Sequence, residues 1–403
     1  AWGMAVAGGR RRVLRAGLGG AALCAPSLAS RAAQPLRVGL LLAMSGPLAR
    51  TSQEISNGFA LALDQADRRV ADRPVRVHVE DTQGRRSRAV ERFARLVQVD
   101  GVDAVIGPTG SPEALALRDA AHEMGVPLIV PNAGASALSA ERCSPFVLRV
   151  SYSNEQLCAP LGGFMARGGQ GRTAYLLGAD NVSGRDHVAA FRKAFSAAGG
   201  TVAGEELVPP GTTDLAPYLG RLKLLRTDII FASFFGEAAE RFLDAVDAFG
   251  LRASRICGPG WLVSTLDLPR IGARAAGIVG ATCYLPELDI PRNRDFVAAY
   301  TGRHGNPPGE FAAQGFDAAR LFLTAAEALD GNVSNRRAFA AMLGRTPFGG
   351  ARGEMVLDPR TNNVVQDIIV FETRKRPGGE GVDFDVLERV KAVRVDAEAC
   401  QMG

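Results

Sequence analysis

Three turns rich in glycine and serine stand where short apolar runs of the sequence end. They read AMSGP at 43–47, GPTGS at 107–111 and PNAGAS at 131–136. Each offers backbone N–H groups, two directly precede helical patterns, and Ser111 adds a hydroxyl donor. Such a turn could cradle a phosphate, expose a nucleophile or bind another anion. Capping and turn chemistry explains any one of them alone, but three converging turns favour a cradle for a carboxylate or amide.

No enzyme motif accompanies these turns. The sequence after residue 33 contains no nucleophile elbow, no H-E-x-x-H pair and no phosphate loop with its lysine. A glycine cluster at 17–20 follows no strand. The six cysteines form no C-x-x-C pair and the four histidines are scattered, which argues against a zinc or redox site. We therefore expect no catalytic residue, no metal and no cofactor.

The elements around the turns explain how they come together. Apolar runs at 36–43, 75–81, 103–107 and 127–131 alternate with helical patterns at about 54–69, 86–99 and 112–124. The same rhythm restarts near Pro145, with strands such as TAYLLGAD and DIIFASF. This alternation predicts an α/β fold with two doubly wound parallel-sheet lobes. Ligands of such sheets bind beyond the carboxyl ends of the strands, where the three turns lie.

The C-terminal part reads differently. Two alternating runs at 350–373 flank the polar DPRTNN turn and predict an antiparallel hairpin. The run FDVLERVKAV at 384–393 predicts one last strand in a charged, glycine-rich tail.

Charge and the N-terminus indicate where the protein works. Residues 1–33 hold five of the 47 basic residues and none of the 42 acidic ones, so the rest is neutral and gives no case for nucleic-acid binding. The stretch GRRRVLRAGLGGAALCAPSLASRAA resembles a twin-arginine export signal. A lipoprotein anchor at Cys24 is less favoured because Leu23 is bulky. We expect 1–33 to direct the chain to the periplasm.

An oxidising compartment makes disulfides plausible. Without Cys24, five cysteines remain, at positions 143, 158, 257, 283 and 400. Cys257 and Cys283 each lie in or near an apolar strand-like run, so we favour that pair, with buried free thiols as the alternative.

Three stretches together resemble a known family. They are RVGLLLAMSGPLARTSQEISNGFALAL (37–63), DAVIGPTGSPEALALRDAAHEMGVPLIVPNAGAS (103–136) and GFDAARLFLTAAEAL (315–329). In this order they look like type I periplasmic solute-binding proteins, nearest to the leucine/isoleucine/valine-binding branch of ABC importers. The resemblance implies two lobes, 36–151 plus 285–348 and 152–284 plus 349–374, with a tail at 375–403. Three crossovers would join them and allow closure on a solute.

The resemblance also implies site residues. The carboxylate-binding serine of the family falls on Ser111, and its next backbone contacts fall on Asn132 and Gly134. Two tyrosines that line the amino-acid site fall on Thr51 and Ser183.

Other site residues lie on the second lobe and in the first turn. The acid that meets a ligand ammonium falls near Glu237. Phe235, with Phe234 and Trp261, stands at strand ends where it could stack on a ring, and Ser45 belongs to the first turn.

The carboxylate side is thus kept while the ammonium side is altered. We expect a monomeric substrate-binding component of an ABC importer that captures a small carboxylate-bearing solute, an amino acid or an aromatic or organic acid. Its partner would be a membrane permease. The alternatives are a ligand-sensing regulatory module of the same fold for amides or urea, and a hydrolase on two α/β lobes.

Overall fold

The apolar runs of the N-terminal half build the first sheet. The computed structural model describes residues 34–402 apart from 168, 170 and 380, so the expected export signal and Cys24 lie outside the described residues. Six strands follow the order β2-β3-β1-β4-β5-β6, and all pairs are parallel except β2 with β3. The strands are β1 (Leu36–Leu42), β2 (Arg69–Val70), β3 (Arg73–Asp81), β4 (Ala104–Ile106), β5 (Leu128–Val130) and β6 (Val147–Arg149).

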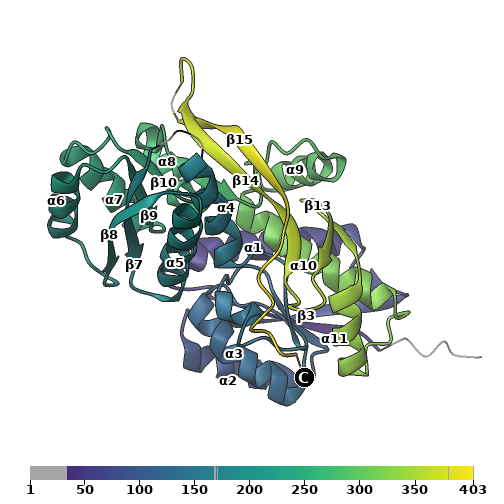
Figure 1. Cartoon of the computed structure of the whole chain (residues 1–403). Coiled ribbons are helices and arrows are strands. Elements are labelled where there is room, and N and C mark those ends of the chain that lie inside the picture. Colours follow the sequence, from purple (N-terminus) through teal and green to yellow (C-terminus); the bar gives the residue numbers. More distant parts are fainter. Residues whose placement is uncertain (1–33, 168, 170, 380, 403) are drawn as a thin grey trace, which may run out of the picture. The chain divides into compact units, whose positions relative to one another are not determined.

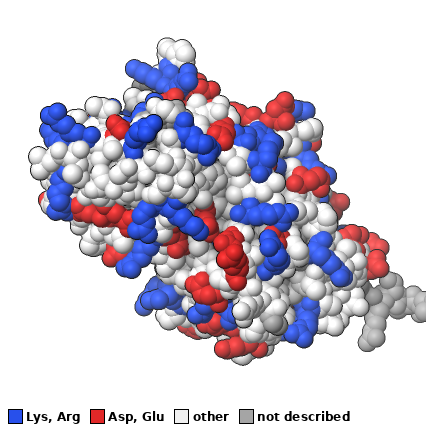
Figure 2. Space-filling model, in the orientation of Figure 1, with Lys and Arg blue, Asp and Glu red and all other residues white. Residues whose placement is uncertain are grey.

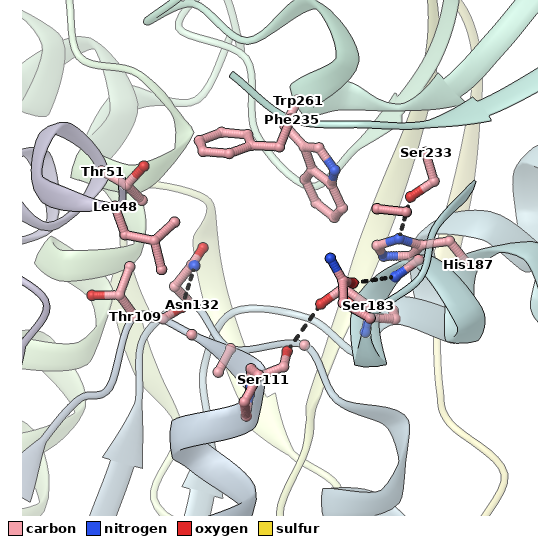
Figure 3. A pocket seen from close by; sticks show the side chains of 18 of the residues that line it. Leu48, Thr51, Thr109, Ser111, Asn132, Ser183, His187, Ser233, Phe235 and Trp261 are labelled. Carbon is pink, nitrogen blue, oxygen red and sulfur yellow. Dashed lines mark hydrogen bonds between the residues drawn. The ribbon is translucent and has the colours of Figure 1, made fainter. Parts of the chain in front are cut away.

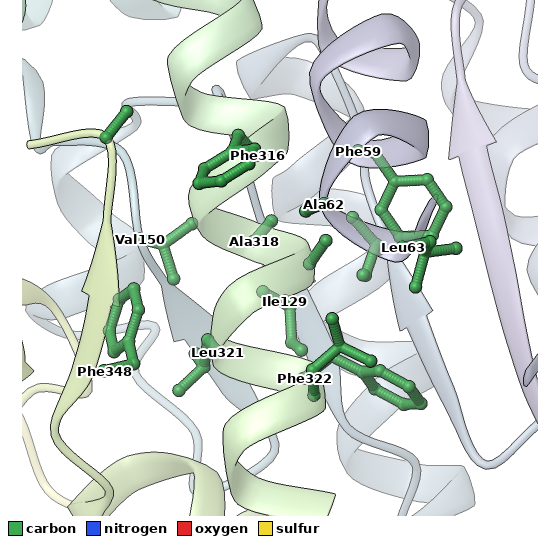
Figure 4. Packing of buried hydrophobic residues seen from close by; sticks show 14 of the residues in the cluster. Phe59, Ala62, Leu63, Ile129, Val150, Phe316, Ala318, Leu321, Phe322 and Phe348 are labelled. Atoms are coloured by element: carbon green, nitrogen blue, oxygen red, sulfur yellow. The ribbon is translucent and has the colours of Figure 1, made fainter. Parts of the chain in front are cut away.

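Helices cover both faces of this sheet, which is why its strands are apolar on both sides. Alternate strand residues pack against α1 (Ala49–Gln65) and α10 (Glu310–Glu327) on one face. The other face packs against α2 (Arg86–Gln98) and α3 (Ser111–Met124). The helices α9 (Pro291–His304) and α11 (Arg336–Arg345) complete the α10 side. Figure 4 shows the core on that side, where Phe59 of α1 and Phe322 of α10 lie over the sheet.

The second sheet has nine strands. Its order is β12-β13-β14-β11-β10-β9-β7-β8, and β15 pairs with β14 (Figure 1). The strands are β7 (Thr173–Ala179), β8 (Thr201–Val208), β9 (Ile229–Ser233), β10 (Arg255–Pro259), β11 (Val279–Thr282), β12 (Phe348–Gly350), β13 (Gly353–Leu357), β14 (Val364–Lys375) and β15 (Val382–Val393). The helices here are α4 (Asn154–Arg167), α5 (Val182–Ala197), α6 (Ala216–Leu225), α7 (Glu237–Ala248) and α8 (Leu268–Ile271).

We call the first sheet with α1–α3 and α9–α11 the first lobe, and the second sheet with α4–α8 the second lobe. The chain leaves the first lobe after β6, returns after β11, and leaves again through β12 to β14. The expected α/β fold with two parallel-dominated sheets is therefore confirmed. The expected hairpin is present as β13 and β14, which pair antiparallel, and the expected last strand is β15.

Two features differ from expectation. Helix α1 begins at Ala49, five residues before the expected start. The sequence does not reveal this start because no capping side chain marks the first turn. The short ribbon of β2 and β3 carries no strong turn signal and was not expected. The earlier start places Thr51 within the first turn of α1.

The favoured disulfide between Cys257 and Cys283 is wrong. The disulfide joins Cys143 to Cys400, whose Cα atoms are 5.6 Å apart. The buried free thiols are Cys158, Cys257 and Cys283. Cys257 pairs with Val279 across parallel strands, so Cys283 lies four residues further along the neighbour. That offset puts the two Cα atoms about 14 Å apart, beyond the reach of a disulfide.

Helices α1 and α10 approach each other through reciprocal glycines. A Cβ atom on Gly58 would lie 1.8 Å from the carbonyl oxygen of Ala312, and one on Gly315 would lie 1.9 Å from that of Ile55. Side chains at these two positions would force the helices apart. The backbone contact sets the distance between the two helices in the first lobe.

A buried ion pair holds the segment that follows β6. Arg352 donates from Nε to Asp317 over 2.7 Å, and the two side chains are 4% and 0% exposed. Arg352 also donates from Nη1 to the Ser151 carbonyl over 3.0 Å.

Within the described residues, no helix is both long and apolar enough to cross a membrane. On the face shown in Figure 2, acidic and basic side chains are interspersed.

Candidate ligand-binding site

A cavity of about 250 Å³ lies where loops at the carboxyl ends of strands from both sheets meet. The first lobe contributes α1 and the turns after β4 and β5. The second lobe contributes the turns after β7, β9 and β10. Open α/β sheets bind ligands at this end, so the topology itself selects the place.

Two helix N-termini point into the cavity, one from each lobe (Figure 3). Ser111 is the first residue of α3, and Ser183 lies in the first turn of α5. The Ser183 hydroxyl donates to Ser111 Oγ over 3.2 Å. Asn181 caps α5 by accepting from the Gly184 N–H over 2.9 Å. Free N–H groups and the helix dipoles make such a place favourable for an anion.

The amide of Asn132 forms the floor beside these N-termini. Its Nδ2 donates to the Thr109 carbonyl over 2.7 Å, and its Oδ1 accepts from the Tyr152 hydroxyl over 3.3 Å. The Thr109 hydroxyl is in turn bonded to that of Ser52 at 2.7 Å. This network fixes the amide before any ligand arrives. A preorganised polar group costs less to engage on binding.

Aromatic side chains form the remaining walls. Trp261 packs against Tyr152 with ring centroids 5.3 Å apart and against His187 at 5.0 Å. Phe235 of the second lobe meets Phe311 of the first lobe edge to face, at 6.2 Å and 89°. These rings give the cavity flat apolar faces of the kind on which a planar ligand stacks.

The cavity contains no ionised side chain. Its described lining residues include no Asp, Glu, Lys or Arg. Burial lowers the pKa of His187 to about 3, so its ring is neutral at physiological pH, and its Nδ1 is bonded to Ser233 Oγ at 2.8 Å. The charge of an anionic ligand would be met by dipoles and hydroxyls. Within the described residues, no group of three or more His, Cys, Asp or Glu could hold a metal ion.

Six of the eight predicted site residues line this cavity. They are Thr51, Ser111, Asn132, Gly134, Ser183 and Phe235, and the predicted neighbours Phe234 and Trp261 line it as well. Gly134 allows the wall to close, because a Cβ there would lie 2.2 Å from Asn154 Oδ1.

The other two lie outside the lining. Glu237 is the first residue of α7, and its 84%-exposed side chain lies 3.5 Å from Arg241 Nη1. The Ser45 hydroxyl donates to Asp81 over 2.7 Å. Their roles at the site remain predictions without a contact in the cavity.

Several lining residues escaped the sequence analysis. They are Leu48, Tyr152, Asn154, Asn181, His187, Ser233 and Phe311, while Thr109 lies in the turn at 107–111 that the sequence analysis singled out. Asn181 could have been found, since an Asn before a helical pattern is a capping signal. His187 lies in the interior of α5, where nothing in the sequence separates it from an ordinary core residue.

Comparisons with known proteins agree with this architecture. The family model described as periplasmic binding protein matches residues 35–379. The Leu/Ile/Val-binding protein homolog 6 of Brucella abortus is 28% identical over 366 residues, which cover 89% of this chain and 93% of that protein.

Two solved structures are also similar. An ABC transporter substrate-binding protein from Sphaerobacter thermophilus has a TM-score of 0.84 and 34% identity, covering 89% of this chain and 98% of that one. A solute-binding protein of an ABC transporter from R. palustris, in complex with benzoate, has a TM-score of 0.83 and 29% identity, covering 91% and 100%. The chain therefore belongs to the periplasmic binding protein family of type I fold, whose members are extracytoplasmic solute-binding proteins and not enzymes.

Proposed function

We propose that this protein captures a small aromatic carboxylate in the cleft between its lobes and delivers it to a membrane ABC permease. The observation that carries the proposal is the pair of helix N-termini, with Ser111 and Ser183 in contact, in a cavity that holds no ionised side chain. When closure of the cleft excludes water, hydroxyl and backbone N–H donors there favour a carboxylate over a neutral group.

The residues take distinct roles in this proposal. Ser111 and Ser183 donate to the carboxylate, and Asn132 with the backbone at Gly134 orients it. The rings of Phe235 and Trp261 contact the body of the solute from the second lobe, and Thr51 lines the wall on α1. A cavity of about 150 Å³ holds benzene, so 250 Å³ leaves room for a ring with its carboxylate.

An α-amino acid is the second candidate. Relatives named for the binding of leucine, isoleucine and valine favour an amino acid, whereas the neighbour in complex with benzoate favours the aromatic acid. A ligand ammonium needs an anionic partner when it is buried. The described lining offers none, because Glu237 points into solvent. This absence of a carboxylate decides our preference for the aromatic acid.

The remaining organisation is also proposed. The lobes would comprise 36–151 plus 285–348 and 152–284 plus 349–374, and the protein would act as a monomer after a twin-arginine-like signal is removed. The regulatory module for amides or urea is not favoured by the comparisons, which are with importer components.

Isothermal titration of the full chain with benzoate, 4-hydroxybenzoate and leucine tests the function. We expect the aromatic acids to bind more tightly than leucine. A hydrogen bond to a charged group contributes about 1.5–3 kcal/mol, so Ser111→Ala and Ser183→Ala should each raise Kd by about tenfold or more. Ser334→Ala, at an exposed serine, is the control. Tighter binding of leucine, or unchanged binding by Ser111→Ala, would contradict the proposal.

A further inference from the structure

Two carboxyl groups of the first lobe are buried together close to residues that line the cavity. Glu54 lies one turn after Thr51 in α1, and Glu310 precedes Phe311 at the start of α10, so both are next to cavity-lining residues. They are 8% and 9% exposed. Neither forms a salt bridge among the described residues.

The two groups are only partly satisfied. Glu310 Oε2 accepts from the Thr282 hydroxyl over 3.0 Å. Glu54 Oε2 and Glu310 Oε1 are buried without a hydrogen-bond partner in the described part of the chain. Buried ionised carboxylates without partners are costly, so this arrangement favours the protonated acids.

The second lobe closes over the same cluster. A Cβ on Gly309 would lie 2.5 Å from Thr265 Oγ1 and 2.8 Å from Glu54 Oε2. Thr265 of the second lobe and Glu54 of the first lobe therefore approach each other beside Gly309. Arg50 of α1 reaches across the cleft, with Nη1 3.3 Å from Asp267 Oδ1 and Nη2 donating to the Leu266 carbonyl over 2.6 Å. The burial of the acids therefore depends on contact between the lobes.

Burial, the mutual repulsion of the two acids and the nearby Asp267 oppose ionisation of the pair, whereas Arg50 favours ionisation of Glu54. Asp267 approaches both acids, and its own carboxylate is taken up by Arg50 and by Arg270, whose Nη2 is 2.6 Å away. Burial, then the neighbouring Glu310, raise the pKa of Glu54 to about 8, while Arg50 acts in the lowering direction. Burial raises the pKa of Glu310 to about 7.

We propose that closure of the cleft over its solute takes up a proton on the Glu54–Glu310 pair, so that solute binding strengthens as pH falls. The inference rests on the proposed function only in that a solute closes the cleft. Separation of the lobes would remove Thr265 and Asp267 from the cluster and admit water to it. The carboxyl groups would then ionise more readily than they do in the closed form.

The direction of the pH effect follows from linkage. A group whose pKa is higher in the closed form favours closure fully below its open-form pKa, and this contribution is lost as pH rises through about 8. For one proton the affinity falls by up to about tenfold per pH unit within that window. A carboxylate ligand is already ionised above about pH 5.5, and His187, with its pKa near 3, does not titrate there.

Calorimetric titration of the full chain with benzoate at pH 5.5, 6.5, 7.5 and 8.5 tests the coupling. Repeating it in buffers of different ionisation enthalpy counts the protons. We expect uptake approaching one proton per benzoate near pH 7 and a Kd that rises with pH. Glu54→Gln and Glu310→Gln, which mimic the protonated acids, should flatten the profile. Glu123→Gln, at an exposed position near the end of α3, should keep it.

The outcomes separate this inference from the proposed function. Benzoate binding with no proton uptake, or with the same pH slope in Glu54→Gln and wild type, overturns the coupling and leaves the function standing. If benzoate does not bind, the same pH series with leucine or 4-hydroxybenzoate, whichever binds, decides the coupling, because closure over either solute would bury the same pair. Equal pH slopes in Glu54→Gln and wild type would then overturn the proposal.

Discussion

Replacing Gly58 by alanine sets two effects of known sign against each other. Gly58 lies inside α1, and alanine is favoured over glycine in a helix interior by about 1 kcal/mol. Helix propensity alone therefore predicts a more stable protein. The contact with α10 predicts the reverse, because the new Cβ would lie 1.8 Å from the Ala312 carbonyl oxygen.

The geometry decides which effect is larger. Carbon and oxygen atoms that are not bonded to each other rarely approach within about 3 Å, so the two helices must separate by roughly 1 Å. The obstacle is backbone, which cannot turn aside as a side chain can. Overpacking typically costs roughly 1–3 kcal/mol, and a backbone contact as short as this one takes the upper part of that range, about 2–3 kcal/mol. After the propensity gain, we expect Gly58→Ala to lower the free energy of unfolding by about 1–2 kcal/mol.

Urea unfolding followed by circular dichroism measures this difference, and a ligand titration gives a second readout. Thr51 and Phe311 line the cavity from the two helices, so separation of α1 from α10 should also raise the Kd for benzoate. Gly302→Ala in α9 is the matched control, since no heavy atom lies within 4 Å of its Cβ position. It should stabilise by up to about 1 kcal/mol. If Gly58→Ala is as stable as the wild type, the packing argument is wrong.

Three further substitutions test other parts of the structure. Gly134→Ala places a Cβ 2.2 Å from Asn154 Oδ1 and should raise Kd about tenfold with little change in melting temperature, as calorimetry and thermal scans would show. Arg352→Met leaves a buried carboxylate unpaired and should cost roughly 3–5 kcal/mol in urea unfolding. Cys143→Ser opens the bond to Cys400 and should cost about 2–4 kcal/mol, a loss that reduction of the wild type should reproduce.

Local patterns explain how much of the fold was predictable. The parallel strands are continuous apolar runs, and the β13–β14 hairpin surrounds a polar turn, so each carries its signal within a few residues. The disulfide has no local sequence signal, because its cysteines are 257 positions apart. They meet only where the tail after β15 reaches the first lobe. The pairing of Cys257 with Cys283 was wrong because of the register between β10 and β11, which the apolar character of the two segments does not reveal.

The candidate site divides in the same way. Ser111 and Ser183 stand at helix starts after strands, and their convergence follows from sheet topology. Glu237 also stands at a helix start, but the preceding Gly236 adopts φ +58° and the Glu237 side chain is exposed to solvent. A single residue of backbone geometry thus separates a site residue from a surface one. The buried Glu54 and Glu310 lay on α1 and α10 without any sequence signal.

The selectivity of the cleft depends on contacts that lie away from it. The end of the cleft proposed to bind the anion is built from helix N-termini, which persist as long as each helix begins where it does. Its aromatic end is assembled from Phe235 of one lobe and Phe311 of the other, and Phe311 is placed by the distance between α1 and α10. The glycine contacts that set this distance therefore influence which solute fits. Substitutions there should alter the choice among rings of different size more than the affinity for the carboxylate.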